Sequence, residues 1–133
     1  MARRLISSGG PWEARYGYSR AVVVGGEAFV SGTTDAGPDG RSLHPGDPAA
    51  QARAVFETIG RALSDGGFEL ADVVRTRMFI TDTANIAAVR TVHGEVLGEI
   101  RPAATIVVVA ALIDPTLLVE IEADARKAAE GPR

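Results

Sequence analysis

The first half of the chain alternates apolar runs with glycine-rich breaks. Residues 21–32 (AVVVGGEAFVSG) read as two strands joined by a tight turn at Gly25-Gly26, where positive φ costs little. A loop rich in Gly, Pro, Asp and Ser follows over 36–48. Asp47-Pro48 predicts a helix start, because aspartate caps a helix well and proline suits its first position. Apolar residues at helical spacing carry this helix to about Ser64.

The second half predicts one further helix between strands. Residues 73–81 (VVRTRMFIT) form a strand by composition, and 85–100 carry apolar residues at helical spacing. Two more strands, 105–112 and 117–125, are joined at Asp114-Pro115. The predicted order is β-β-α-β-α-β-β, with a further N-terminal strand around Leu5 as an option. Hairpins at both ends favour an antiparallel or mixed sheet in an α+β domain.

Two of the predicted strands are apolar on both faces. Residues 21–24 and 106–112 do not alternate with polar residues, which indicates that both faces of the sheet are covered. Two helices of this length cover one face only, so another subunit is the simplest cover for the other. A closed barrel, or a long loop folded over the sheet, is the alternative.

Length and composition describe one globular domain. The 133 residues fit a single domain over 1–133, with a core at about 12–126 and a frayed tail over 127–133. The net charge of −3, with Lys127 as the sole lysine, argues against a nucleic-acid partner. No run reaches the ~20 apolar residues of a membrane span, and no signal-peptide pattern follows Arg3 and Arg4. We therefore expect a cytoplasmic protein with no membrane partner.

The chain offers little for a metal or cofactor. It contains no cysteine, which excludes disulfides, thiol nucleophiles and thiolate metal sites. His44 lies in the Gly/Pro loop without histidine or cysteine neighbours at ligand spacing. We expect neither a metal nor a cofactor.

Several segments, read in order, form a recognisable series. They are Gly17-Tyr18-Ser19-Arg20, Phe29-Val30-Ser31-Gly32-Thr33, Asp47-Pro48-Ala49-Ala50-Gln51-Ala52, Met78-Phe79-Ile80-Thr81-Asp82, Arg101-Pro102-Ala103 before a valine-rich strand, and Val119-Glu120-Ile121-Glu122-Ala123. Over roughly residues 12–125 this series resembles the reactive intermediate deaminase family (Rid; RidA or YjgF-like). The resemblance implies a chorismate-mutase-like fold with two helices on one face of a mixed sheet. It also implies a homotrimer with ligand clefts between the subunits.

The resemblance also implies a chemistry. Family deaminases hydrolyse reactive enamines and imines to a keto acid and ammonia, which calls for a cation to hold the substrate carboxylate and a group to orient water. In the family pattern the cation is the third residue of Pro-Ala-Arg. The matching residue here is Ala104, which cannot bind a carboxylate. The departure predicts either another cation at the site or a loss of the usual 2-imino-acid deamination.

Glu120 is the candidate catalytic residue. Strand alternation places Glu120, Glu122 and Asp124 on one face of their strand. Glu120 matches the family position that contacts the ligand or its water, so we expect it to orient the attacking water. A plain solvated strand face is the alternative, because neighbouring carboxylates repel unless they are solvated or paired.

Arginines are the candidate substitutes for the missing cation. Arg75 and Arg77 share one face of their strand, with Val74, Met78 and Ile80 on the other. Arg77 is the first candidate and Arg20 the second. Arg101 is a weaker candidate. It lies three residues before Ala104, and side chains an odd number of residues apart on a strand point to opposite faces. Each also fits the common role of a solvated surface arginine.

Four further residues complete the candidate ligand site. Tyr18 can wall a pocket or simply pack, and Ser31-Gly32 allow a ligand to approach the backbone or form a simple turn. His93 fits a buried, hydrogen-bonded histidine better than a general acid or base. Outside this set, Trp12-Glu13 can anchor an interface or wall a cleft, and the sequence does not choose between these two roles.

Three functions are consistent with these residues. The first is hydrolysis of C=N bonds in reactive enamines, imines or related carbonyl derivatives, with a small, carboxylate-bearing substrate. The second is a non-catalytic trimer that binds a small metabolite. The third and weakest is a ribonuclease-like activity, which the acidic balance disfavours.

Overall fold

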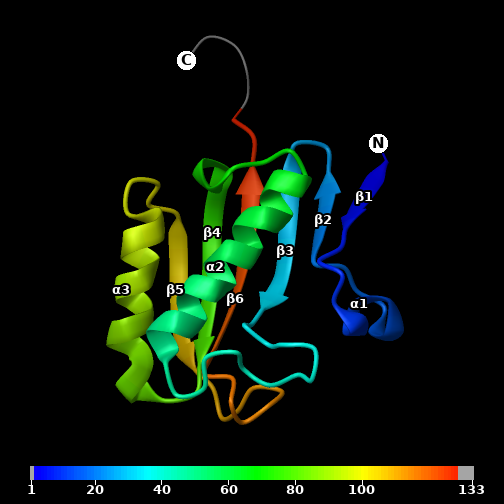
Figure 1. The fold of residues 1–133 in the computed structure, drawn as a ribbon. Coiled ribbons are helices and arrows are strands. Elements are labelled where there is room, and N and C mark those ends of the chain that lie inside the picture. The colour runs from blue at the N-terminus through cyan, green and yellow to red at the C-terminus, as the bar shows by residue number, and fades with distance from the viewer. Residues whose placement is uncertain (1, 129–133) are drawn as a thin grey trace.

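Six strands form one sheet, with two long helices packed on one side of it (Figure 1). The computed structural model describes residues 2–128. Its elements in chain order are β1 (Arg3–Ile6), α1 (Pro11–Tyr16), β2 (Ala21–Val24), β3 (Glu27–Thr33), α2 (Pro48–Asp65), β4 (Val73–Ile80), α3 (Ile86–Leu97), β5 (Ala103–Val108) and β6 (Val119–Arg126), with short 3₁₀ turns at Leu70–Asp72 and Thr83–Asn85. The predicted α+β class, mixed sheet and optional strand around Leu5 are confirmed.

The order of strands in the sheet corrects one prediction. The order is β1-β2-β3-β6-β4-β5, and only the β4–β5 pair is parallel. The hairpin predicted for the last two strands is therefore wrong, because β6 lies between β3 and β4 and pairs with both. The physical reason is the crossover through α3, which returns the chain to the side of β4. The segment 109–118 then carries the chain back to the centre of the sheet.

Helices α2 and α3 cover one face of the sheet and enclose the core (Figure 1). The predicted start of α2 is confirmed, since the Asp47 side chain accepts a hydrogen bond from the Ala50 amide at 3.0 Å. The apolar stripe of α2 packs against alternate residues of the strands. The largest fully buried apolar side chains are Ile59, Leu63, Ile80, Leu97, Leu117 and Ile121.

Two local features differ from the predictions. Val74 was expected on the inner face of its strand, but it is exposed, because a register shift between Val73 and Arg75 turns it outward. Helix α1 was not predicted at all. It begins after Gly10 with Pro11 and ends at Gly17, whose φ of 79° is the left-handed conformation that glycine favours at a helix end.

Within residues 2–128, no helix covers the second face of the sheet. Cross-strand pairing places Val22, Phe29, Phe79 and Val107 on this open face. Phe29 and Val107 are 44% and 41% exposed. Large apolar side chains gathered on one exposed face are typical of a surface that binds another molecule.

The end of the chain is described only in part. The frayed tail was predicted for 127–133, of which 129–133 lie outside the described residues. Lys127 is placed, with its Nζ 3.3 Å from Asp72 Oδ2 and 5.2 Å from the centre of the Phe68 ring.

Candidate active site

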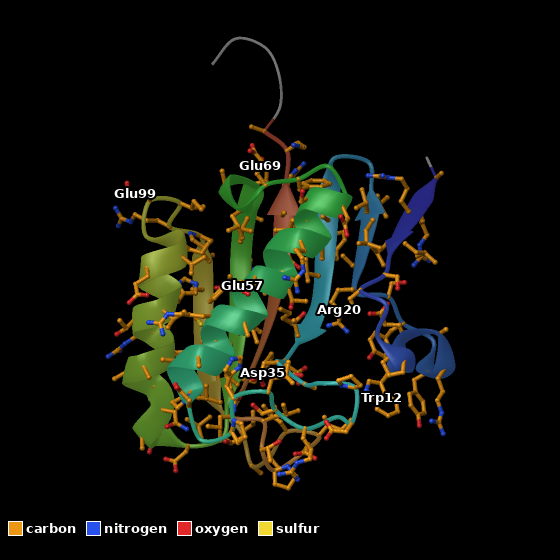
Figure 2. All side chains as sticks on the ribbon, viewed as in Figure 1. Trp12, Arg20, Asp35, Glu57, Glu69 and Glu99 are labelled. Atoms are coloured by element: carbon orange, nitrogen blue, oxygen red, sulfur yellow. The ribbon has the colours of Figure 1, made fainter. Side chains whose placement is uncertain are left out.

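A nearly buried arginine lies where β2 begins and β3 ends. Arg20 is 9% exposed, and its Nη1 donates to the Gly32 carbonyl at 2.8 Å and to Thr33 Oγ1 at 3.0 Å. Its guanidinium carbon lies 5.5 Å from the centre of the Tyr18 ring. Figure 2 shows Arg20 at this end of β2, between α2 and the segment that holds Trp12. The backbone at the strand end thus fixes the direction of this cation.

The Tyr18–Arg20 segment and the end of β3 are tied together. Ser31 donates from its amide to the Arg20 carbonyl at 2.9 Å and from its hydroxyl to the Ser19 carbonyl at 2.6 Å. The structure therefore brings together four residues that the sequence singled out, Tyr18, Arg20, Ser31 and Gly32. They come from a loop and from one end of a neighbouring strand, which the β2–β3 hairpin places side by side.

Glu120 joins this group from β6. It is half-buried on the open face, where Phe79 is its partner on β4. Its carboxylate lies against Gly32 so closely that a Cβ at residue 32 would overlap it. Burial raises the pKa of Glu120; the positive charge of Arg20 opposes this rise, and the neighbouring Glu122 adds to it. A carboxylate with a raised pKa beside a fixed cation is suited to proton transfer.

Arg77 lies on the same face as Glu120 but is engaged elsewhere. Its Nη1 is 3.3 Å from Glu122 Oε1 and 3.4 Å from Asp124 Oδ2. Arg77 pairs with Glu122 across the two strands, two residues along from the Phe79–Glu120 pair. The two carboxylates that flank it already balance its charge. The geometry therefore favours Arg20 over Arg77 as the cation beside Glu120.

His93 and Ala104 belong to the other side of the sheet. His93 Nε2 is 2.8 Å from Thr76 Oγ1, and its ring meets Phe56 edge-on. Burial lowers the pKa of His93, so the ring is neutral at pH 7. Thr76 pairs directly with Ala104 on β5, which places both on the helix-covered face. Within one chain neither residue is brought to Glu120.

Sequence reasoning left one residue of this region undecided. Glu13, on α1, is 5% exposed and lies 3.7 Å from Arg20 Nε through its Oε2 atom. A cavity of about 150 Å³ borders Arg20, between Ser7, Ser8 and residues of α2 that include Thr58 and Arg61. The Gly-Pro start and the glycine end of α1 were the sequence signals that could have revealed the helix.

The described part of the chain offers no site for a metal. Among residues 2–128 no three histidine, aspartate or glutamate side chains gather in a way that could hold a metal ion. Nor is any helix in that range long and apolar enough to cross a membrane.

The chain is similar to known proteins in both sequence and structure. The sequence model of the Endoribonuclease L-PSP family matches residues 11–127. A Mycobacterium tuberculosis structure of the YjgF family shares 46% identity and a TM-score of 0.85, covering 95% of this chain and 100% of that one. The 3-aminoacrylate deaminase RutC of Acinetobacter baylyi is 38% identical over 104 residues, 78% of this chain and 82% of that protein.

A further solved structure shows a ligand in a relative. The E. coli protein TdcF, crystallised with bound serine, is 28% identical with a TM-score of 0.75, and the match covers 94% of each chain. The match over residues 11–127 includes Tyr18, Arg20, Gly32 and Glu120. The resemblance to the Rid family is therefore confirmed, and the chain belongs to the Endoribonuclease L-PSP family, which includes the YjgF-type proteins.

Proposed function

We propose that this protein hydrolyses the C=N bond of a small enamine or imine that carries a carboxylate. In this proposal Glu120 activates the attacking water and Arg20 holds the substrate carboxylate. The observation that carries it is the half-buried Glu120 carboxylate, with its raised pKa, packed against Gly32 beside the fixed guanidinium of Arg20.

The chemistry follows from those two groups. The enamine first tautomerises to an imine: carbon gains a proton from solvent and nitrogen loses one to solvent. Glu120 then accepts a proton from water as the hydroxyl oxygen bonds to the imine carbon, and the carboxyl returns that proton to nitrogen. Collapse of the resulting carbinolamine breaks the C–N bond and releases ammonia and a carbonyl product. Because its pKa is raised, Glu120 is a stronger base than an ordinary glutamate, which favours the transfer of this proton.

Arg20 is suited to bind the substrate carboxylate because only some nitrogens of its guanidinium contact the protein. Its Nη1 is taken by the end of β3, and Nε faces Glu13. Within residues 2–128 its Nη2 has no hydrogen-bond partner. An arginine held on one side offers its remaining donors in a fixed direction, which favours a planar anion. This arrangement supports Arg20 in the role that Ala104 cannot fill.

The names of two relatives point to ligands of the same chemical class. One is named a 3-aminoacrylate deaminase, and 3-aminoacrylate is an enamine with a carboxylate. Another was crystallised with serine, an amino acid that carries a carboxylate.

We further propose that the protein forms a homotrimer with its sites in clefts between subunits. The open face, with Val22, Phe29, Phe79 and Val107, would be covered by neighbouring copies. Glu120 lies on this face, so a neighbouring subunit would wall its site. The same contact would exclude bulk water, leaving the attacking water, and strengthen the interaction of Glu120 with substrate.

One observation favours a second function, a trimer that binds metabolites without turning them over. Ala104 lacks the charge of the family pattern, and Arg77 is occupied by Glu122 and Asp124. A ribonuclease activity, although part of the family description, is the weakest option. The row of carboxylates at Glu120, Glu122 and Asp124 would repel a phosphate backbone.

Ammonia release decides between these functions. The protein would be incubated with 3-aminoacrylate, and with 2-iminopropanoate generated in situ, and ammonia would be followed against buffer alone. We expect faster release with the wild-type protein and its loss in Glu120→Gln, while the surface variant Glu99→Gln keeps it. Thermal stabilisation by pyruvate without any acceleration would instead support the binding function. Full activity in Glu120→Gln would overturn the proposed role of Glu120.

A further inference from the structure

The carboxylate of α1 is buried, and no step proposed above uses it. Glu13 Oε1 accepts from Ser7 Oγ at 2.9 Å, and the Ser8 amide lies 3.3 Å from both carboxylate oxygens. Ser8 Oγ donates a short hydrogen bond to Oε2, the same oxygen that faces Arg20 Nε at 3.7 Å. Burying a carboxylate is costly unless it is paired and hydrogen-bonded. The contacts from Ser7, Ser8 and Arg20 meet both conditions.

Helix α1 buries nothing else. Glu13 is the single buried residue of its six, and the other five face solvent or are only partly covered. Most helices in proteins are stabilised by packing an apolar face. The sequence instead begins α1 with Pro11 and ends it with Gly17, so that the chain makes a short turn around one charged side chain. The element holds Glu13 in place and adds no apolar residue to the buried core.

We propose that Glu13 is a positioning residue for Arg20: it fixes the guanidinium from the side opposite β3 and offsets part of its charge, so that Glu120 can act as a base. The inference rests on the proposed function. Arg20 is then held by Glu13 on Nε and by Gly32 and Thr33 on Nη1, which leaves Nη2 for a ligand.

The charge of Arg20 acts on both Glu13 and Glu120. Burial acts to raise the pKa of Glu13, but hydrogen bonds from Ser8 and Ser7 and the charge of Arg20 hold it below its usual value. Glu13 is therefore ionised at neutral pH. Glu120 has Arg20 and Glu122 as its charged neighbours, with uncharged Gly32 and Phe79 on the adjacent strands. Without Glu13, the charge of Arg20 would act on Glu120 undiminished.

The direct test is the titration of Glu120 in a Glu13→Gln variant. Glutamine keeps the size of the side chain and can hydrogen-bond to the serines, while the bonds from Arg20 to Gly32 and Thr33 remain. Carboxyl carbons of ¹³C-labelled glutamate would be followed by NMR against pH, with the Glu120 signal assigned by its loss in Glu120→Gln. We expect a lower pKa for Glu120 in Glu13→Gln than in the wild type. An unchanged or higher pKa would overturn the inference.

The control for this titration is a glutamate far from Arg20. Glu99→Gln makes the same chemical change at an exposed residue far from Arg20 (Figure 2) and should leave the Glu120 titration unchanged. The titration does not depend on turnover. Full ammonia release by Glu120→Gln would defeat the proposed function, whereas an unshifted Glu120 titration would defeat the role of Glu13 alone.

A second variant covers the case in which Glu13→Gln does not fold. Ser8→Ala keeps the charge of Glu13 but removes a hydroxyl that holds it. We expect KM for 3-aminoacrylate to rise about two- to tenfold with kcat little changed, the size of one lost hydrogen bond acting on substrate binding. Ser8→Thr, which keeps the hydroxyl, should restore KM. An unchanged KM in Ser8→Ala would contradict the positioning role.

Discussion

Gly32 lies directly against the carboxylate of Glu120. This carboxylate occupies the space that a Cβ at residue 32 would need. The contact joins the end of β3 to the start of β6, two segments far apart in sequence. It makes the absence of a side chain at residue 32 a condition for the position of Glu120.

Gly32→Ala should displace the Glu120 carboxylate. The added methyl group would force the flexible Glu120 side chain to swing away, at little cost in stability, and ammonia release should fall. Gly94→Ala is the control, because a Cβ at that helical position meets open space, and alanine there should stabilise the fold by about 0.5–1 kcal/mol. Urea unfolding and the ammonia assay together test both; an active Gly32→Ala would contradict the packing argument.

Arg20→Ala and Arg77→Ala should affect KM differently. If Arg20 holds the substrate carboxylate, its loss should raise KM about ten- to a hundredfold, the value of a hydrogen bond to a charged group. Arg77→Ala should leave KM close to the wild-type value, because Arg77 is paired with Glu122 and Asp124. Steady-state kinetics on 3-aminoacrylate would measure both. A larger rise in KM for Arg77→Ala would reverse the assignment.

Phe29→Glu should prevent assembly. Phe29 lies on the open face directly across from Asp124, so the variant would place two like charges side by side and make the face polar. We expect a trimer for the wild-type protein and a monomer for Phe29→Glu by size-exclusion chromatography with light scattering. Ala87→Glu, on the exposed side of α3, should remain trimeric. A trimeric Phe29→Glu would mean that this face is not the contact surface.

His93 should make stability depend on pH. Burial lowers its pKa in the folded state below the ordinary value of 6.5, so the unfolded chain binds the proton first as pH falls. The stability contributed by the neutral ring is complete above about pH 6.5 and is lost between that value and the lower folded pKa. Urea midpoints at pH 7.5 and 5.5 should therefore differ more in the wild type than in His93→Gln. Equal differences would show that His93 does not titrate in this way.

Asp35→Ala should destabilise the loop that follows β3. The buried Oδ2 of Asp35 accepts from Ser42 Oγ at 2.8 Å, and the amide and ring Nδ1 of His44 each lie 3.1 Å away. Removing the carboxylate leaves those donors unpaired, which we expect to cost about 1–3 kcal/mol. Asp39→Ala is a matched control, since Asp39 is exposed and its Oδ1 accepts a hydrogen bond from the Arg41 amide at 3.0 Å. Chemical denaturation would show whether the two variants differ.

The alternation along β6 was predictable from the sequence, and so was its consequence. Val119, Ile121 and Ala123 are buried, while Glu120, Glu122 and Asp124 lie on the open face, because side chains alternate with a period of two. The amphipathic stripe and cap of α2 were equally predictable. These features depend on neighbours a few residues apart, which the sequence contains.

The sequence could not say which strands pair. A period of two assigns a side chain to a face but not a strand to a neighbour, so the last two strands looked like a hairpin although β6 inserts between β3 and β4. The register shift that exposes Val74 is decided by the same pairing. For this reason the separation of His93 and Ala104 from Glu120, on opposite faces of the sheet, could not be predicted.

The sequence by itself determined the α+β class, the family resemblance and the absence of the usual arginine at Ala104. Only the tertiary structure decided which positive charge acts on Glu120: Arg20 lies close enough to oppose the rise in its pKa, whereas Arg77 is paired with Glu122 and Asp124. The physical reason is that a charge acts through distance and burial. Arg20 and Glu120 are a hundred positions apart in the chain, and β3 brings them together through Gly32.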